Sequence, residues 1–249
     1  MLRSYGDTNL FGESYGEGPA RVLWLHGWAR RGEDFRAVAL ELAQRGVASV
    51  ALDLPGFGAS PVPGLAGGAR HYAELILPAV REIADEPVVL VGHSFGGCVA
   101  TVIASTRPEL VRSLVLVAAP LLRAAPSRAP RTYRMVRWLH SKALVSDGRM
   151  EAARQKYGSS DYRRAHGVMR DVLVASVNES YEGELARLRV PIVFLWGEND
   201  REVPVEVASR SASLLTTTHE ERVVSGVGHL VPTEAPEALL SAVEASLRL

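Results

Sequence analysis

Short runs of apolar, mostly β-branched residues recur along this chain and constrain its fold more than any other feature. They occupy residues 21–25, 47–52, 88–91, 114–117 and 192–196, with 222–224 as a shorter candidate. These runs are apolar on both faces, as strands buried within a parallel sheet must be. Amphipathic stretches between them predict helices: one ending near Gly46, one over 72–84 with Pro78 as a break or kink, one just after Ser94 and one after Pro236. The alternation predicts an α/β fold with a doubly wound, mostly parallel sheet.

The alternation stops between residues 121 and 189. This stretch contains no convincing strand, but it contains helical patterns such as Met169, Val172 and Val177. The sheet pattern resumes at Val190. We therefore expect an α/β core formed by residues 1–120 and 190–249, interrupted by a helical cap over 121–189.

Composition excludes several classes of protein. The chain has 249 residues, of which 47% are hydrophobic and 22% charged, so it can build a full core. Its 28 basic and 28 acidic residues balance, which argues against a nucleic-acid partner. The single cysteine, Cys98, excludes an intramolecular disulfide and a cysteine-based metal site. No apolar run reaches the ~18 residues of a membrane helix, and the first residues lack a signal-peptide core. We expect a cytoplasmic protein with no membrane association.

The sequence Gly92-His93-Ser94-Phe95-Gly96 lies directly after an apolar strand and directly before a helix rich in small residues. This is the G-x-S-x-G pattern in its strand–turn–helix context. Such a turn strains the serine backbone, and glycines at its two ends remove clashes with neighbouring side chains. Ser94 also stands at a helix N-terminus, where free amides favour developing negative charge. A glycine-rich turn with a capping serine is the alternative without catalysis.

A serine nucleophile needs a base, and the base needs an orienting acid. Asp200 follows the strand at 192–196, and His229 follows the last short strand in a glycine-flanked loop. The chain order is nucleophile, acid, base: Ser94, Asp200, His229. Glu198 is the rival acid, but it lies nearer the strand. We predict Asp200.

The turn His26-Gly27-Trp28 follows the first long strand and can supply an oxyanion hole. The backbone amides of Trp28 and Phe95 would donate to the substrate oxygen, each contributing ~3 kcal/mol to lowering the barrier. We expect His26 to hold this loop. We expect His93 to pack or hydrogen-bond beside the nucleophile.

The sequence resembles the α/β-hydrolase superfamily over nearly its whole length. The matching motifs are His26-Gly27-Trp28, the segment 53–60, the turn around Ser94, and the Asp200 and His229 loops. The resemblance implies eight strands, a helical cap after the sixth, and a structural role for residues 53–60. Within the superfamily, the chain is similar to serine carboxylesterases, enol-lactone hydrolases and the esterases of pimeloyl-carrier-protein methyl ester. The last have tryptophan at the position of His93.

The cap carries two features that bear on substrate and partner. We expect Trp138, Leu139, Leu144, Met169, Val172 and Leu173 to pack the cap and to roof a mostly apolar pocket; we place Trp28, His93, Leu139 and Met169 around the substrate.

Residues 110–146 contain no acid but seven basic residues: Arg112, Arg123, Arg128, Arg131, Arg134, Arg137 and Lys142. They form either a solvated face or a basic patch for an anionic substrate or an acidic carrier protein.

These residues predict a serine hydrolase that cleaves a short-acyl ester, a lactone or a thioester without a metal or an organic cofactor. The same fold also serves lyases, cofactor-free haloperoxidases and small-molecule receptors, which form the second class. An interaction domain built on an inactive hydrolase is the third. Reaction with a fluorophosphonate separates a hydrolase from a binding protein.

Overall fold

A computed structural model describes residues 1–7, 9–123, 131–157 and 159–249. For Arg131 it describes the backbone alone. Eight strands form one sheet in the order β1-β2-β4-β3-β5-β6-β7-β8. β1 pairs antiparallel with β2, β2 pairs antiparallel with β4, and all other neighbours run parallel. The predicted α/β fold with eight mostly parallel strands is therefore confirmed.

The strands are β1 (Leu2–Tyr5), β2 (Leu10–Tyr15), β3 (Val22–Leu25), β4 (Ser49–Leu52), β5 (Val88–His93), β6 (Val111–Val117), β7 (Ile192–Gly197) and β8 (His219–Val224). Strands β3 to β7 are almost wholly buried, which explains why they are visible in the sequence as continuous apolar runs. The hydrophobic pattern did not reveal β1 and β2. β1 lies at the sheet edge and exposes three of its four residues, and β2 alternates buried with partly buried residues and has no continuous apolar run.

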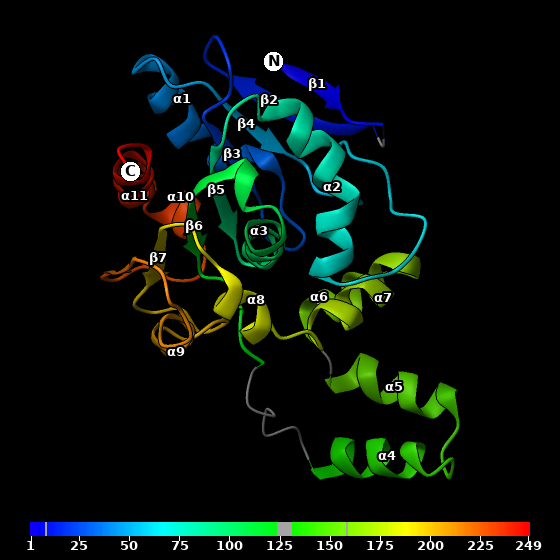
Figure 1. The fold of residues 1–249 in the computed structure, drawn as a ribbon. Helices are drawn as coiled ribbons and strands as arrows, with labels where there is room; N and C mark the ends of the chain where they lie inside the picture. The colour runs from blue at the N-terminus through cyan, green and yellow to red at the C-terminus, as the bar shows by residue number, and fades with distance from the viewer. Residues whose placement is uncertain (8, 124–130, 158) are drawn as a thin grey trace.

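Helices cover both faces of the sheet (Figure 1). One apolar layer joins α2 (Ala69–Ile83), α3 (Phe95–Thr106) and α8 (Glu182–Arg187), and extends to α9 (Glu206–Ala212). The opposite layer joins α1 (Arg36–Gln44) to α10 (Val231–Glu234) and α11 (Pro236–Leu247). Short 3₁₀ helices η1 (Gly32–Phe35) and η2 (Pro108–Leu110) precede α1 and β6. α2 continues through Pro78 and buries the side chains on one face, so that proline does not end the helix.

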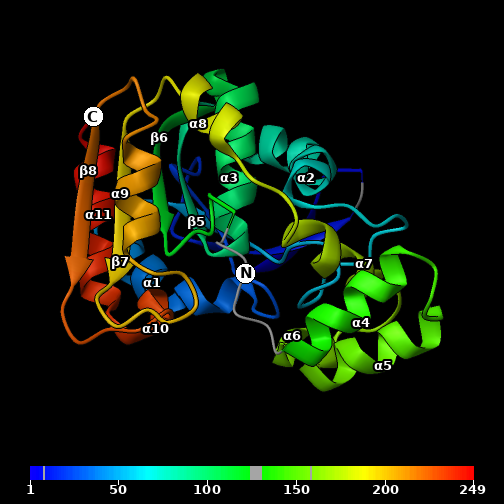
Figure 2. The ribbon, with the colours of Figure 1, turned by 90° about the horizontal axis from the view of Figure 1, so that it is seen from below.

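The chain between β6 and β7 forms α4 (Arg131–Ser141), α5 (Asp147–Tyr157), α6 (Ser160–Arg164), α7 (Gly167–Ser176) and α8, and its described residues include no strand. We call α4 to α7 the inserted helices. α4 and α5 pack against each other and lie away from the sheet, whereas α7 lies closer to α2 (Figures 1 and 2). Within the described ranges, no helix is long and apolar enough to cross a membrane.

Candidate active site

The turn between β5 and α3 holds Ser94 in a strained backbone conformation. Ser94 has φ 48° and ψ −118°, which is rare for a residue with a side chain. Its N–H donates to the carbonyl of Val117 on β6 (2.8 Å), and its own carbonyl accepts from Gly97 in the first turn of α3 (2.9 Å). These bonds hold the hydroxyl at the carboxyl edge of the sheet, just before the helix N-terminus.

Glycines flank this turn because neighbouring backbone leaves no room for a side chain. A Cβ on Gly96 would lie 2.2 Å from the carbonyl oxygen of Leu25, at the end of β3. One on Gly92 would lie 2.5 Å from both the carbonyl oxygen of Gly96 and the Cα of Gly97. The first turn of α3 can therefore pack directly onto strands β3 and β5.

Asp200 and His229 are brought together from the loops after β7 and β8. His229 Nδ1–H donates to Asp200 Oδ2 over 2.8 Å, and the Asp200 side chain is fully buried. Asp200 Oδ1 accepts from the backbone amides of Glu202 (2.8 Å) and Val203 (2.9 Å). These three donors stabilise a buried carboxylate. Glu198 instead accepts from the amide of Gly226 at 2.9 Å and is exposed.

The remaining ring nitrogen of His229 faces a residue that the sequence did not single out. Nε2 lies 3.7 Å from a carboxylate oxygen of Glu202, whose side chain is mostly exposed. Among the described residues, the Ser94 hydroxyl makes no hydrogen bond. Catalytic hydrogen bonds are often long or misaligned before substrate binds. Glu202 gave no signal in the sequence because only the turn after Asp200 directs it back towards the histidine.

In the described ranges, the backbone amides of Trp28 and Phe95 have no hydrogen-bond partner. The rings of these two residues are 5.9 Å apart, and the loop of Trp28 reaches Ser94 through Gly27. A Cβ on Gly27 would lie 3.2 Å from Ser94 Cβ. The turn that carries Trp28 therefore lies directly against the turn that carries Ser94 and Phe95.

His26 links the loop after β3 to the loop after β4. Its Nε2 accepts from the amide of Leu54 over 2.9 Å, while Nδ1 lies 2.7 Å from the carbonyl of Gly27 and donates to it. Burial lowers the pKa of His26 to about 4, so the ring is neutral at pH 7. The Asp53 carboxylate closes the segment 53–60 by accepting from Gly32 and Ala59, both at 2.8 Å.

A cavity of about 270 Å³ lies next to this site. Its lining residues are Trp28, Ala29, Gly56 and Phe57 from the core loops and Asp161, Arg164, Ala165, His166 and Met169 from α6, α7 and their connection. Two of the four residues predicted for the substrate pocket, Trp28 and Met169, are in this lining. His93 is not, because it lies buried behind Ser94, and Leu139 is not, because it lies on α4.

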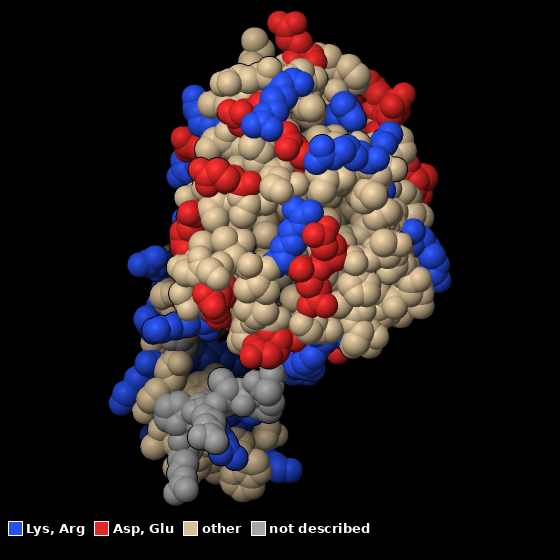
Figure 3. All heavy atoms as spheres, turned by 90° about the vertical axis from the view of Figure 1, so that its left-hand side faces the viewer, with Lys and Arg blue, Asp and Glu red and all other residues tan. Residues whose placement is uncertain are grey.

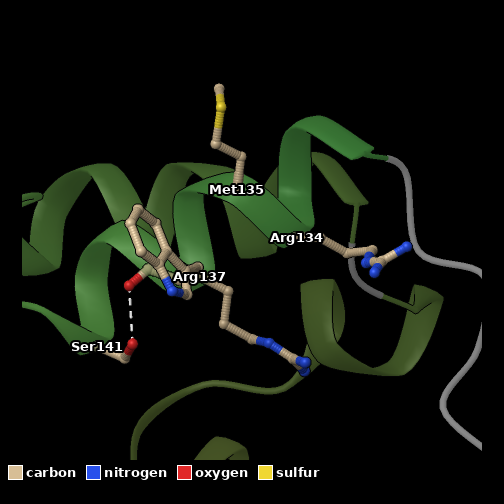
Figure 4. Close-up of a pocket in the computed structure, with 5 residues that line it drawn as sticks. Arg134, Met135, Arg137 and Ser141 are labelled. Carbon is tan, nitrogen blue, oxygen red and sulfur yellow. Dashed lines mark hydrogen bonds between the residues drawn. The ribbon is translucent and has the colours of Figure 1, made fainter.

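The expected packing of the inserted helices is correct for Val172 and Leu173, which are buried, and wrong for two residues. Trp138 is 59% exposed and Leu144 is 67% exposed. Figure 4 shows Arg134, Met135 and Arg137 projecting from α4, and these residues line a hollow together with Trp138 and Ser141. α4 packs on α5, where the rings of Tyr133 and Tyr157 lie 5.9 Å apart, and the helical spacing alone did not show which apolar residues of α4 are covered.

Lys and Arg side chains gather over the lower part of the molecule in Figure 3, where the inserted helices lie. Arg134 and Arg137 belong to α4, and Lys142 follows it; all three are exposed. Arg128 lies outside the described residues, so its place relative to this surface is not defined. In the ranges that the structure covers, no group of three His, Cys, Asp or Glu residues is arranged to hold a metal ion.

The strained serine, the Asp–His pair and the parallel sheet together define a class of α/β hydrolytic enzymes. Comparison with known proteins agrees, because the model of the alpha/beta hydrolase family matches residues 22–242. The chain belongs to the α/β hydrolase family.

Individual relatives cover nearly the whole chain. It is 30% identical over 240 residues to a pimeloyl-[acyl-carrier protein] methyl ester esterase of Chromobacterium violaceum, covering 93% of this chain and 88% of that one. A protein of the same name from Vibrio parahaemolyticus is 28% identical over 235 residues, covering 86% and 88%. Among solved structures, an esterase from Exiguobacterium antarcticum superimposes with a TM-score of 0.76 at 19% identity, covering 100% of this chain and 99% of that one.

Proposed function

We propose that this chain is a serine hydrolase that cleaves carboxylic esters, including lactones and thioesters, through an acyl-enzyme. The buried hydrogen bond between His229 and Asp200, at the same sheet edge as the strained Ser94, carries this proposal. The esterase names of the curated relatives support ester hydrolysis as the reaction.

In the proposed mechanism, Ser94 Oγ attacks the ester carbonyl carbon while His229 Nε2 takes the hydroxyl proton. Asp200 orients the ring and stabilises the imidazolium through the Nδ1–H bond. The Trp28 and Phe95 amides stabilise the oxyanion. The alcohol or thiol leaves with the proton from His229, and water then cleaves the acyl-enzyme by the same steps. None of these steps requires a metal or an organic cofactor.

Stoichiometric labelling by a fluorophosphonate tests the assignment of Ser94. We expect one adduct per chain, located at Ser94 by mass spectrometry, because the reagent requires an activated serine. Ser94→Ala is the matched control and is expected to take up no label. If folded wild-type protein stays unlabelled, the proposal is wrong, and use of the fold as a receptor or other binding protein is favoured. A labelled protein that turns over no ester would point to a lyase or a haloperoxidase.

We further propose that the enzyme prefers short acyl groups, about C2 to C6. Trp28 packs edge-to-face against Phe57 (ring centroids 5.0 Å apart) and Phe95, and the rings of Trp28 and Phe57 line the cavity next to the site. Each methylene that fits adds ~0.8 kcal/mol of binding, whereas one that clashes costs more. With p-nitrophenyl esters of increasing chain length, kcat/KM should peak by C6. A maximum at C10 or beyond would contradict this proposal.

The exposed face of α4 supports an acidic carrier protein as a partner, in agreement with the acyl carrier protein in the relatives' names. Arg134, Met135, Arg137 and Trp138 line the same hollow on α4, and arginine, methionine and tryptophan are enriched in protein interfaces. We propose that residues 121–189 form a cap over the site, and that α4 on this cap meets the carrier.

Charge reversal tests this partner. The double change Arg134→Glu and Arg137→Glu should lower kcat/KM for a carrier-linked methyl ester about tenfold or more and leave p-nitrophenyl acetate unaffected, because only the larger substrate reaches α4. Arg81→Glu, at an exposed position on α2, controls for net charge. Equal losses for both substrates would contradict a docking role.

A further inference from the structure

His93, the last residue of β5, connects the nucleophile to the base through one hydrogen bond. Its Nε2 lies 2.9 Å from the backbone oxygen of His229, and the ring is 1% exposed. A carbonyl oxygen only accepts, so Nε2 must carry the hydrogen and donate it. His93 is covalently bonded to Ser94, and its acceptor belongs to His229. The bond therefore links the residue next to Ser94 to the backbone of His229, and Ser94 and His229 are the two residues that must exchange a proton.

The surroundings of His93 allow only one form of the ring. Burial, aided by the nearby His229, lowers the pKa of His93 to about 3, so the imidazole is neutral at pH 7. Nδ1 has no partner among the described residues and faces Gly27, where an added Cβ would lie 2.9 Å from it. With Nδ1 facing an apolar contact, the single hydrogen is held on Nε2.

Among the described residues, the other hydrogen bonds of the loop that carries His229 do not reach the turn around Ser94. Gly228 N–H bonds to Glu234 (2.7 Å), and Asn199 N–H bonds to the carbonyl of Val227 (2.8 Å), but these partners belong to α10 and to the loop of Asp200. In the parts of the chain that the structure describes, the His93–His229 bond is the one hydrogen bond between residues 92–96 and residues 225–230. Asp200 fixes the ring of His229 but does not fix its distance from Ser94.

We propose that His93 is a positioning residue whose Nε2–H bond to the His229 carbonyl sets the distance between Ser94 and the catalytic base. This inference rests on the proposed function of Ser94 and His229. His93 does not touch the reacting atoms. It acts because a displacement of about 1 Å between reacting groups can cost 100-fold in rate.

Three variants test the bond itself. In His93→Gln the side-chain amide nitrogen can take the place of Nε2 and keep the donor, whereas His93→Leu fills a similar volume without a donor. His93→Asn keeps an amide but places it near the position of Nδ1, short of the His229 carbonyl. For each variant, kcat is divided by the fraction of chains that a fluorophosphonate labels, so that unfolded protein does not lower the value of kcat.

We expect His93→Leu and His93→Asn to lose about 100-fold in kcat per labelled site, with KM within about threefold of wild type. His93→Gln is expected to recover to within about tenfold of wild type. A melting curve accompanies each variant. If His93→Leu does not fold, the comparison of His93→Asn with His93→Gln decides. A role confined to stability would lower the melting temperature and the labelled fraction while kcat per labelled site stayed unchanged, and this result would overturn the proposal. Equal losses of kcat per labelled site in His93→Gln and His93→Asn would also overturn it.

A second readout does not depend on catalysis. In ¹⁵N-resolved NMR spectra, His93 should remain the neutral Nε2–H tautomer from pH 8 to pH 5, and the Nε2–H proton should exchange slowly with solvent. An Nδ1–H tautomer at His93 would overturn the proposal. Absence of any fluorophosphonate adduct on wild-type protein would instead refute the proposed function, so the two failures are distinguishable.

Discussion

Asp200→Asn is expected to lower kcat by about 10⁴-fold while the protein stays folded. An asparagine of nearly the same shape can present its amide to His229, and the ring then carries its hydrogen on Nε2 instead of Nδ1. In that tautomer Nε2 cannot take the proton of Ser94. Removing the negative charge also leaves the imidazolium without its partner. Steady-state kinetics with a p-nitrophenyl ester, together with a thermal melt, measures both effects.

Glu198→Gln is the matched control because it makes the same change two residues earlier. Glu198 accepts from the amide of Gly226, and a glutamine oxygen can accept the same bond. We expect kcat within about threefold of wild type. If Glu198→Gln lost as much as Asp200→Asn, or if Asp200→Asn kept more than a tenth of wild-type kcat, Asp200 would not be the orienting acid.

The pairing of Asp200 with His229 could be predicted from the sequence because chain order and strand ends restrict the choice. Parallel strands end at one edge, so loops that follow β5, β7 and β8 must meet there. Asp200 also stands far enough from β7 for the chain to turn, and its carboxylate closes that turn by accepting from Glu202 and Val203. Glu198 lies too close to the strand and is used in the turn at Gly226 instead.

Features that depend on packing between distant segments could not be predicted in the same way. The role of His93 depends on a bond to residue 229, and nothing local distinguishes it from any buried histidine. Trp138 and Leu144 match a helix spacing typical of packed residues, but only the placement of α4 shows that they are exposed. β1 and β2 have no continuous apolar run because only parts of these strands are covered.

Gly96→Ala is expected to lower both the free energy of unfolding and kcat, because the added methyl group clashes with the backbone at the end of β3. The new Cβ would lie 2.2 Å from the Leu25 carbonyl oxygen and 2.5 Å from that of His26, which are backbone atoms that cannot rotate away. α3 must therefore move from β3. We expect a loss of about 3 kcal/mol or more in the free energy of unfolding, at the upper end for overpacking. Urea unfolding monitored by fluorescence measures it.

The same displacement would separate the two amides proposed for the oxyanion, since Phe95 moves with α3 and Trp28 stays with the loop after β3. Loss of one such donor costs about 10²- to 10³-fold in kcat. Gly148→Ala is the matched control, because a Cβ there meets nothing within 4 Å and the position lies in helix α5. Alanine is favoured over glycine in helices, so stability should stay equal or rise by up to ~1 kcal/mol, with kcat unchanged. If Gly96→Ala behaved like Gly148→Ala, α3 and β3 could separate without cost, and close packing of the Ser94 turn on β3 would not be what aligns the two amides.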